Sequence, residues 1–218
     1  MLLPQVKPKV VRPCEDRRIV EPFWEEGYED PNADTFGPPS EEILALLPRL
    51  PTGSKILDLG CGDGRNALPF AAAGFEVHAI DKSSRGIERL LTRASEHGVS
   101  IDAWVQDLSD YTPNQSYDVI ITHGVLHLLR SNHCLHLIHQ IQATTNVGGW
   151  NVHAVFTDRL PQPMDLAPFV HRPFPEGELA ELYESWEIEL FRSYIFEDEH
   201  PGGIRHRHAI DKIVAKRR

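Results

Sequence analysis

The stretch Lys55-Ile56-Leu57-Asp58-Leu59-Gly60-Cys61-Gly62-Asp63-Gly64 decides the fold of this chain. Its apolar residues predict the end of a short buried strand, and glycines follow at positions 60, 62 and 64. Glycine adopts positive φ and lets a ligand approach the backbone closely. We expect a helix from about Arg65 and then a strand from Phe75 to Ile80 that ends in Asp81. This unit predicts a nucleotide-binding turn, with the Asp81 carboxylate on a ribose.

The glycine spacing distinguishes between cofactors. A dinucleotide-binding turn reads Gly-x-Gly-x-x-Gly, whereas here the third glycine comes one residue early because position 65 is Arg. Asp58 also lies two residues before the first glycine. The pattern Asp-x-Gly-x-Gly-x-Gly resembles motif I of the class I S-adenosyl-L-methionine (SAM)-dependent methyltransferases. The alternative, a glycine-rich turn without a ligand, is disfavoured because the strands, helix and acids all follow in order.

Composition excludes several classes of protein. The chain has 218 residues, enough for one α/β domain, and its net charge of −10 argues against a nucleic-acid partner. Cys14, Cys61 and Cys134 lack metal-type spacing and do not suggest a disulfide framework, so we expect a reducing compartment. The first residues lack an apolar signal region, and no later segment is apolar enough to span a membrane. We therefore expect a cytoplasmic monomer or homodimer.

The pattern of apolar residues and turn formers predicts the remaining elements. Residues 1–38 are proline-rich and are expected to form an extended N-terminal arm. Ser40 is expected to cap a helix that buries Ile43 and Leu46, and Ser84 is expected to cap another. Further strands are expected at 102–107, 117–122, 150–156, 186–196 and 205–214, helices at 132–145 and 176–183, and an active-site lid at 157–175.

These elements predict an α/β, Rossmann-like class I methyltransferase fold. Strands alternate with helices, and the last two strands form a hairpin around Pro201-Gly202-Gly203. We expect a mostly parallel seven-stranded sheet with one antiparallel strand near an edge and helices on both faces. Ligands of such sheets bind beyond the carboxyl ends of the strands, where strand order reverses.

Four segments carry a more specific resemblance. The stretches 57–66, 79–82, 173–179 and 183–186 are similar to those of the tellurite-resistance methyltransferase family, and the resemblance covers roughly residues 35–218. It implies a SAM-dependent methyltransferase domain over residues 39–218 that methylates a small soft nucleophile, such as a chalcogen oxyanion (tellurite or selenite) or a thiol. The alternatives are an O- or N-methyltransferase of a small metabolite and a SAM-binding regulatory module without turnover.

The predicted cofactor residues each have a physical role. Asp58 is placed to organise the turn and bind the cationic amino group, and Asp81 can accept from both ribose hydroxyls. Asp107 can accept from the adenine amino group, unless it only caps a helix. His123 is expected near the sulfonium, or else as a pocket-wall histidine with satisfied hydrogen bonds. The full predicted set is Asp58, Gly60, Cys61, Gly62, Asn66, Asp81, Lys82, Gln106, Asp107, Leu108, Thr122 and His123.

Histidines and arginines gather in the second half of the chain. His171 and Arg172 lie in the predicted lid, and the last strand opens with Arg205-His206-Arg207-His208, where arginines and histidines alternate between faces. This cluster predicts an anionic substrate, and the alternative is an edge strand protected by charge against aggregation. The family resemblance implies one catalytic histidine and one catalytic arginine here. The candidates are His200, Arg205, His206 and Arg207.

Two absences favour a small-molecule acceptor. The segment Thr122-His123-Gly124-Val125 contains neither the Asn/Asp-Pro-Pro-aromatic sequence of amino-group nucleic-acid methyltransferases nor a Pro-Cys nucleophile. Histidines at positions 123 and 127, and at 133, 136 and 139, have helical spacing, but acids or cysteines do not complete a ligand set near them. We therefore expect neither a metal nor a nucleic-acid partner.

Overall fold

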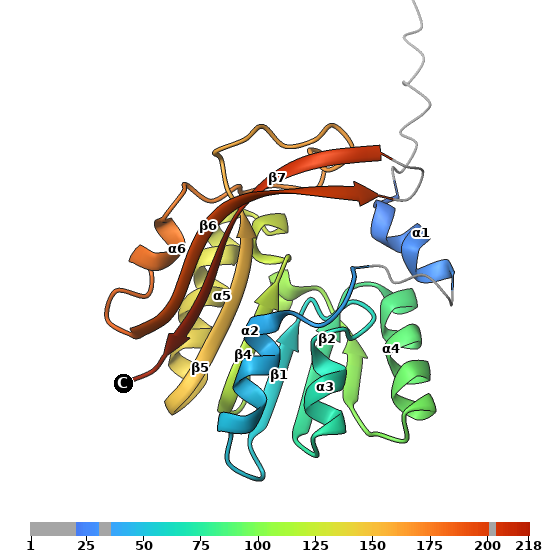
Figure 1. Ribbon diagram of the computed structural model, residues 1–218, viewed down its shortest axis with the longest axis vertical. Helices are drawn as coiled ribbons and strands as arrows, with labels where there is room; N and C mark the ends of the chain where they lie inside the picture. Colours follow the sequence, from blue (N-terminus) through green and yellow to red (C-terminus); the bar gives the residue numbers. More distant parts are fainter. Residues whose placement is uncertain (1–20, 31–35, 201–203) are drawn as a thin grey trace, which may run out of the picture.

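The computed structural model describes residues 21–30, 36–200 and 204–218. Its centre is a seven-stranded sheet with strand order β3-β2-β1-β4-β5-β7-β6 (Figure 1). The strands are β1 (Lys55–Leu59), β2 (Glu76–Asp81), β3 (Asp102–Val105), β4 (Tyr117–His123), β5 (Thr145–Phe156), β6 (Glu187–His200) and β7 (Ile204–Lys216).

One strand of the sheet runs against the others. β7 pairs antiparallel with both β5 and β6, whereas the neighbours among β3, β2, β1, β4 and β5 pair in parallel. β6 therefore runs parallel to β5 at the sheet edge. This arrangement confirms the predicted fold class. Strand order reverses between β1 and β4, which places the expected ligand crevice beyond the carboxyl ends of these two strands.

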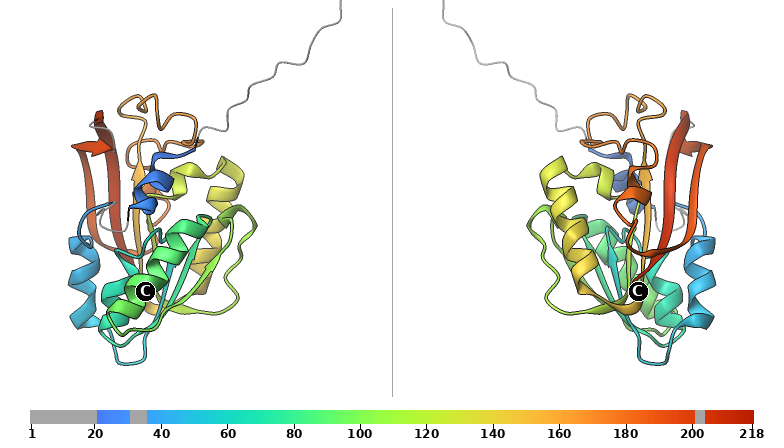
Figure 2. Two further views of the ribbon diagram at one scale, coloured as in Figure 1. Left: turned by 90° about the vertical axis from the view of Figure 1, so that its right-hand side faces the viewer. Right: turned by 90° about the vertical axis from the view of Figure 1, so that its left-hand side faces the viewer.

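Helices cover both faces of the sheet, and α2 and α5 lie on opposite sides in Figure 2. Apolar side chains of α2, α3 and α4 pack in one buried cluster, and those of α5 and α6 in another. No helix in the described ranges has the length and apolarity needed to cross a bilayer. The helices are α1 (Phe23–Glu29), α2 (Glu41–Leu46), α3 (Ala67–Ala72), α4 (Ser84–Glu96), α5 (Ser131–Thr144) and α6 (Glu178–Glu181), with 3₁₀ turns η1 (Leu47–Arg49), η2 (Leu108–Asp110) and η3 (Leu126–Leu128).

Several element boundaries differ from the prediction. Ser83, not Ser84, caps α4, because its hydroxyl accepts from the Gly86 N–H at 3.0 Å. α6 begins only at Glu178, since Gly177 before it has φ of 91° and cannot continue a helix. Ser40 occupies the N-cap position of α2, yet its side chain does not bond to the helix. Its hydroxyl lies 3.0 Å from His123 Nε2 instead.

The predicted extended arm is wrong for residues 23–29, which form α1. Trp24 and Tyr28 on this helix are buried in a cluster with Leu166. The helix is also held to the start of α4, because the Ser83 hydroxyl donates to Glu25 at 2.9 Å and Arg85 pairs with Glu29 at 3.1 Å. Of the other residues predicted for the arm, 1–20 and 31–35 lie outside the described residues.

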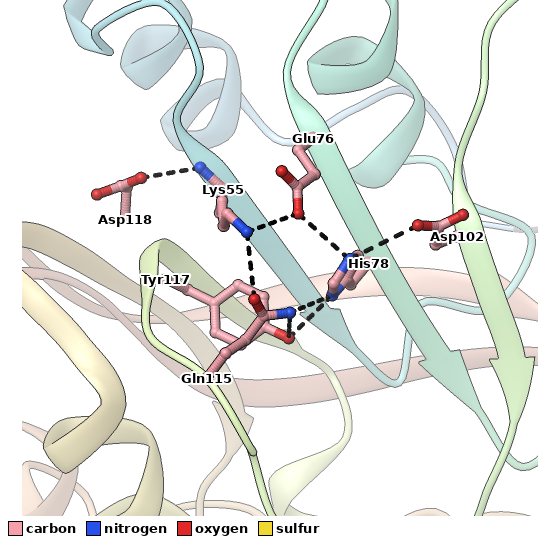
Figure 3. A network of polar contacts seen from close by, with 7 residues as sticks. All are labelled: Lys55, Glu76, His78, Asp102, Gln115, Tyr117 and Asp118. Carbon is pink, nitrogen blue, oxygen red and sulfur yellow. Dashed lines mark hydrogen bonds and ion pairs between the residues drawn. The ribbon is translucent and has the colours of Figure 1, made fainter.

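A polar network joins the amino ends of the central strands (Figure 3). Lys55 at the start of β1 reaches Glu76 on β2 at 2.9 Å and the Gln115 side chain at 3.2 Å. His78 on β2 shares a hydrogen bond of 2.9 Å with the Tyr117 hydroxyl on β4. These contacts fix the strands at the end opposite the expected crevice.

Candidate active site

A cavity of about 840 Å³ lies at the carboxyl ends of the strands. One half of its lining comes from the glycine turn after β1, the end of β2 and η2. The other half comes from η3 and from β5, β7 and β6. The cavity therefore extends across the point where strand order reverses, which is where an α/β sheet of this kind binds its ligand.

The glycine turn is fastened to the neighbouring strand β2. The N–H groups of Gly60 and Cys61 donate to the Ile80 carbonyl at 2.7 and 3.0 Å. The two Asp81 carboxylate oxygens accept from the N–H groups of Gly62 and Ser83 at 2.9 and 2.8 Å. Burial raises the pKa of Asp81, and these two hydrogen bonds act in the opposite direction. The carboxylate is therefore fixed in position, and each oxygen retains a lone pair for a ligand hydroxyl.

Tyr28 from α1 lies directly over Gly62. Gly62 has φ of +54°, and a Cβ at this position would run into the Tyr28 hydroxyl. Burial, with the charge of Asp81 nearby, raises the pKa of Tyr28 well above its usual range, so the hydroxyl stays neutral. The N-terminal helix thus covers the cofactor turn, and only glycine at position 62 leaves it room.

Replacing Gly62 by alanine is expected to lower the free energy of unfolding by about 1–3 kcal/mol, through positive φ and the contact with Tyr28. Gly53→Ala is a matched control, because Gly53 has φ of +83° and no atom of the described residues lies within 4 Å of an added Cβ. Denaturant unfolding measures the free energy of unfolding that each variant loses, and the difference between the two losses gives the contribution of the Tyr28 contact. Equal losses in the two variants would show that α1 does not rest on the turn.

Asp58 is the buried acid at this end of the cavity. Its side chain is 2% exposed, and its Oδ2 atom has no hydrogen-bond partner among the described residues. Burial raises the pKa of Asp58 to about 7, with Arg65 opposing and Asp81 adding to this rise. A buried carboxylate oxygen without a partner carries a high free-energy cost, which a cationic ligand group would offset.

Asp107 combines both of the roles considered from the sequence. Its carboxylate accepts from the Ser109 N–H at 2.8 Å and caps η2, and this bond lowers its pKa. The residue also lines the cavity, next to the buried Leu108. At the same end, the Lys82 ammonium lies 6.0 Å from the centre of the Trp24 ring.

His123, at the end of β4, has hydrogen-bond contacts at both ring nitrogens. Arg65 Nη2 lies 2.9 Å from Nδ1, and because a guanidinium can only donate, Nδ1 accepts and Nε2 carries the proton. Nε2 lies 3.1 Å from Glu42 Oε1 and 3.0 Å from the Ser40 hydroxyl. Burial lowers the pKa of His123, and the bond to Glu42 opposes this shift. His123 is therefore a neutral wall residue with its hydrogen bonds satisfied.

Glu42 joins His123 to the last strand. Its Oε1 atom also lies 3.0 Å from Lys212 Nζ on β7. Burial works against the ionised form, yet hydrogen bonds from His123, the backbone and Lys212 outweigh it and lower the pKa of Glu42 to about 2. Glu42 stays charged at any physiological pH. Lys212 and His123 line the cavity while Glu42 holds them from outside the lining.

His127 in η3 is a second neutral histidine of the lining. It is 1% exposed, and its Nδ1 accepts from the Phe156 N–H at 3.1 Å, so Nε2 carries the proton. Burial lowers the pKa of His127 to about 3, and the nearby His208 and His123 add to this. The ring is stacked on Phe156, with centroids 4.1 Å apart.

Comparison with known proteins identifies the family. The family model described as "Tellurite resistance protein TehB" matches residues 41–200. The chain belongs to the TehB family of class I SAM-dependent methyltransferases. This confirms the family resemblance predicted from the motifs, and SAM is the cofactor of the site.

Individual relatives agree with this assignment. The chain is 35% identical over 136 residues to a probable SAM-dependent methyltransferase TehB of Haemophilus influenzae (strain 10810), which covers 62% of this chain and 46% of that protein. The crystal structure of TehB from Haemophilus influenzae superposes with a TM-score of 0.73 at 26% identity, covering 82% of this chain and 62% of that one. A ubiquinone biosynthesis O-methyltransferase of Rickettsia akari is 40% identical over 81 residues, covering 37% of this chain and 32% of that protein. The chain thus spans less than half of the TehB relative that it matches.

The residues of this TehB-family chain fit SAM. The Asp58 oxygen without a partner suits the cationic amino group, and the fixed Asp81 carboxylate suits the ribose hydroxyls. Ten of the twelve predicted cofactor residues line the cavity: Asp58, Gly60, Cys61, Gly62, Asn66, Asp81, Lys82, Asp107, Leu108 and His123. Gln106 and Thr122 do not line it. The Thr122 hydroxyl instead lies 2.6 Å from His153 Nδ1 in the core, and Gln106 accepts from the Trp104 ring at 3.2 Å.

Three of the four predicted catalytic residues, Arg205, His206 and Arg207, do not line the cavity. Arg205 and Arg207 are exposed, because strand alternation turns them away from the face that carries Ile210 and Lys212. His206 Nε2 lies 3.0 Å from Asp165 Oδ2 in the predicted lid, and neither residue lines the cavity. The His200 side chain lies outside the described residues.

The half of the cavity formed by η3, β5, β7 and β6 is called the acceptor half, and the half around the glycine turn the cofactor half. Sequence reasoning missed the groups that line the acceptor half. Lys212 and Ile210 come from the same strand as the predicted cluster, a few residues further on. His127 was considered only as a metal ligand. Side-chain alternation along β7 puts Lys212 on the same face as Ile210, which also lines the cavity.

Proposed function

We propose that this chain transfers the methyl group of SAM to a small, soft acceptor that reaches the site already ionised. A chalcogen oxyanion such as tellurite or selenite, or a thiolate, has this property. The supporting observation is that two of the four histidines that line the cavity, His123 and His127, are held as neutral Nε2–H tautomers by donors on Nδ1. Neither ring can take a proton without opposing a hydrogen-bond donor, so neither is a suitable general base.

The charges at the acceptor half support an anion. Arg65 and Lys212 line the cavity as cations, and Glu42 neutralises part of the Lys212 charge from behind. Their positive charge would attract an anionic nucleophile and keep it close to the glycine turn, which Arg65 directly follows. SAM supplies an activated methyl group, so the chain has mainly to align the nucleophile and exclude water.

Two segments that are distant in the sequence cover the site. Leu166 in the predicted lid, residues 157–175, is 2% exposed and packs with Trp24 and Tyr28 of α1. Trp24 contacts Phe169 edge to face, with ring centroids 5.4 Å apart. The contact between His206 and Asp165 joins the same segment to β7. We propose that this cover excludes water during transfer.

The remaining expectations are part of the proposal. A methyltransferase domain over residues 39–218, a cytoplasmic location, a monomer or homodimer, and the absence of membrane and nucleic-acid partners all stay predictions. A catalytic role of His200, Arg205, His206 or Arg207 also stays a prediction. Alanine variants that lose turnover while retaining SAM affinity would support such a role.

The test is label transfer from methyl-labelled SAM to selenite, tellurite, a thiol and a phenol at saturating SAM. We expect the anionic acceptors to be methylated with a kcat whose pH profile shows no group of the protein titrating near pH 6.5. His171→Ala should leave this pH profile of kcat unchanged. A phenol, which needs a base, should react at least about 10²-fold more slowly. Equal turnover of the phenol would favour a metabolite O-methyltransferase. SAM binding without any transfer would favour a regulatory module.

A further inference from the structure

A row of neighbouring rings, of which the first three are stacked and the next two tilted, forms one wall of the acceptor half. His127 stacks on Phe156 with centroids 4.1 Å apart, and Phe156 stacks on His208 at 4.7 Å and an interplanar angle of 10°. Phe196 follows at 5.2 Å from His208, and Tyr194 at 6.3 Å from Phe196. We call these five residues the aromatic wall. Its rings come from η3, β5, β7 and β6.

The strand register places the aromatic wall on one face of the sheet. Ile210 on β7 opposes Phe156 on β5 and Tyr194 on β6, and His208 opposes Phe196. Residues paired across strands point to the same face. Phe156, Phe196, Tyr194 and Ile210 all line the cavity, and Tyr194 is 36% exposed. The covering segment 157–175 therefore leaves part of this apolar surface open to a ligand.

A charged group adjoins this apolar surface. Lys212 lies two residues from Ile210 on the same face of β7 and lines the cavity. Arg65 lines the cavity next to the glycine turn. The acceptor half thus combines cations near the cofactor turn with rings on β5, β7 and β6. A bare oxyanion has no apolar surface to bury, so the aromatic wall would add nothing to its binding.

We infer that the acceptor is an aromatic thiolate, with its ring on the aromatic wall and its sulfur directed toward Lys212 and Arg65. This inference rests on the proposed function and specifies its substrate class. The thiolate lone pair forms a bond to the methyl carbon while the methyl–sulfonium bond breaks. The products are a neutral aryl methyl thioether and S-adenosylhomocysteine, and no proton moves.

The test compares two acceptors with the same nucleophilic atom, benzenethiol and hydrosulfide, near pH 8, where both are largely ionised. We expect kcat/KM to be at least about tenfold higher for benzenethiol, because its ring is buried against Phe196 and Tyr194, which line the cavity. Phe196→Ala should raise KM for benzenethiol about tenfold and affect hydrosulfide far less. Phe191→Ala is the matched control, since Phe191 is on the same strand, is 38% exposed and does not line the cavity.

A binding measurement separates this inference from the proposed function. Benzenesulfonate carries the same ring and a negative charge but cannot be methylated under these conditions. It should bind the S-adenosylhomocysteine-loaded protein in calorimetry, and Phe196→Ala should weaken that binding while Phe191→Ala does not. If Phe196→Ala weakens the binding of benzenesulfonate but no anionic acceptor is methylated, the proposed function is contradicted. If selenite and hydrosulfide are methylated while neither benzenethiol nor benzenesulfonate depends on Phe196, the aromatic acceptor is refuted.

Discussion

SAM is expected to bind about tenfold more tightly near pH 7.5 than near pH 5.5, because Asp58 must be ionised to pair with the cationic amino group. The pKa of Asp58 in the free protein is about 7, mainly because the carboxyl is buried. Below this pH most molecules carry a neutral Asp58, which binds a cation poorly. Isothermal calorimetry across this pH range measures the effect. Affinity that is flat or falls with pH would contradict the pairing.

Asp58→Asn is expected to remove most of the pH dependence of SAM binding. It is also expected to remove the pH dependence that Asp58 gives to the free energy of unfolding. The folded pKa of about 7 lies above the ordinary value of 3.8, so the contribution of Asp58 is favourable at low pH. The contribution of Asp58 to the free energy of unfolding falls as pH rises from about 4 to about 7, by up to about 1.4 kcal/mol per pH unit. At pH above 7 the variant without cofactor should therefore unfold at higher denaturant concentration than the wild type. Asp110→Asn, at an exposed position in η2, is the control.

Asp81→Ala is expected to reduce SAM affinity about ten- to a hundredfold, since hydrogen bonds to a charged group contribute about 1.5–3 kcal/mol. The variant loses the acceptor for the ribose hydroxyls and also the two bonds that hold Gly62 and Ser83. Calorimetry with SAM gives the affinity, and Asp110→Ala is the matched control. Circular dichroism establishes that the variant is folded. Unchanged affinity in a folded Asp81→Ala protein would overturn the assignment of Asp81 to the ribose.

The cofactor half could be predicted from the sequence because its signal is local. Asp58, the glycine turn and Asp81 lie within two dozen residues of one another, and glycine at φ > 0 has few substitutes. The order of strands and helices, including the antiparallel hairpin, followed from the same kind of local pattern. The errors at Ser84 and Glu176 came from choosing between neighbouring cap positions.

The acceptor half could not be predicted because its contacts join distant elements. Glu42 on α2 meets His123 on β4 and Lys212 on β7, which are far away in sequence. Three-dimensional packing alone determines that this carboxylate has two partners. Similarly, Arg205 and Arg207 were predicted as catalytic candidates because arginines and histidines are concentrated in this part of the sequence. Their strand face and distance along β7 separate them from the lining.

Glu42 influences the acceptor half although it does not line the cavity. The surface that an acceptor touches is formed by lining residues such as Lys212 and His123, whereas Glu42, which is not among them, sets their net charge. The electrostatic preference of the cavity is thus encoded partly at a position that an acceptor does not touch. A change at position 42 would alter the charge around Lys212 and release the contacts that hold Lys212 and His123. Selectivity for charge is therefore open to evolution, or to engineering, from behind the binding surface.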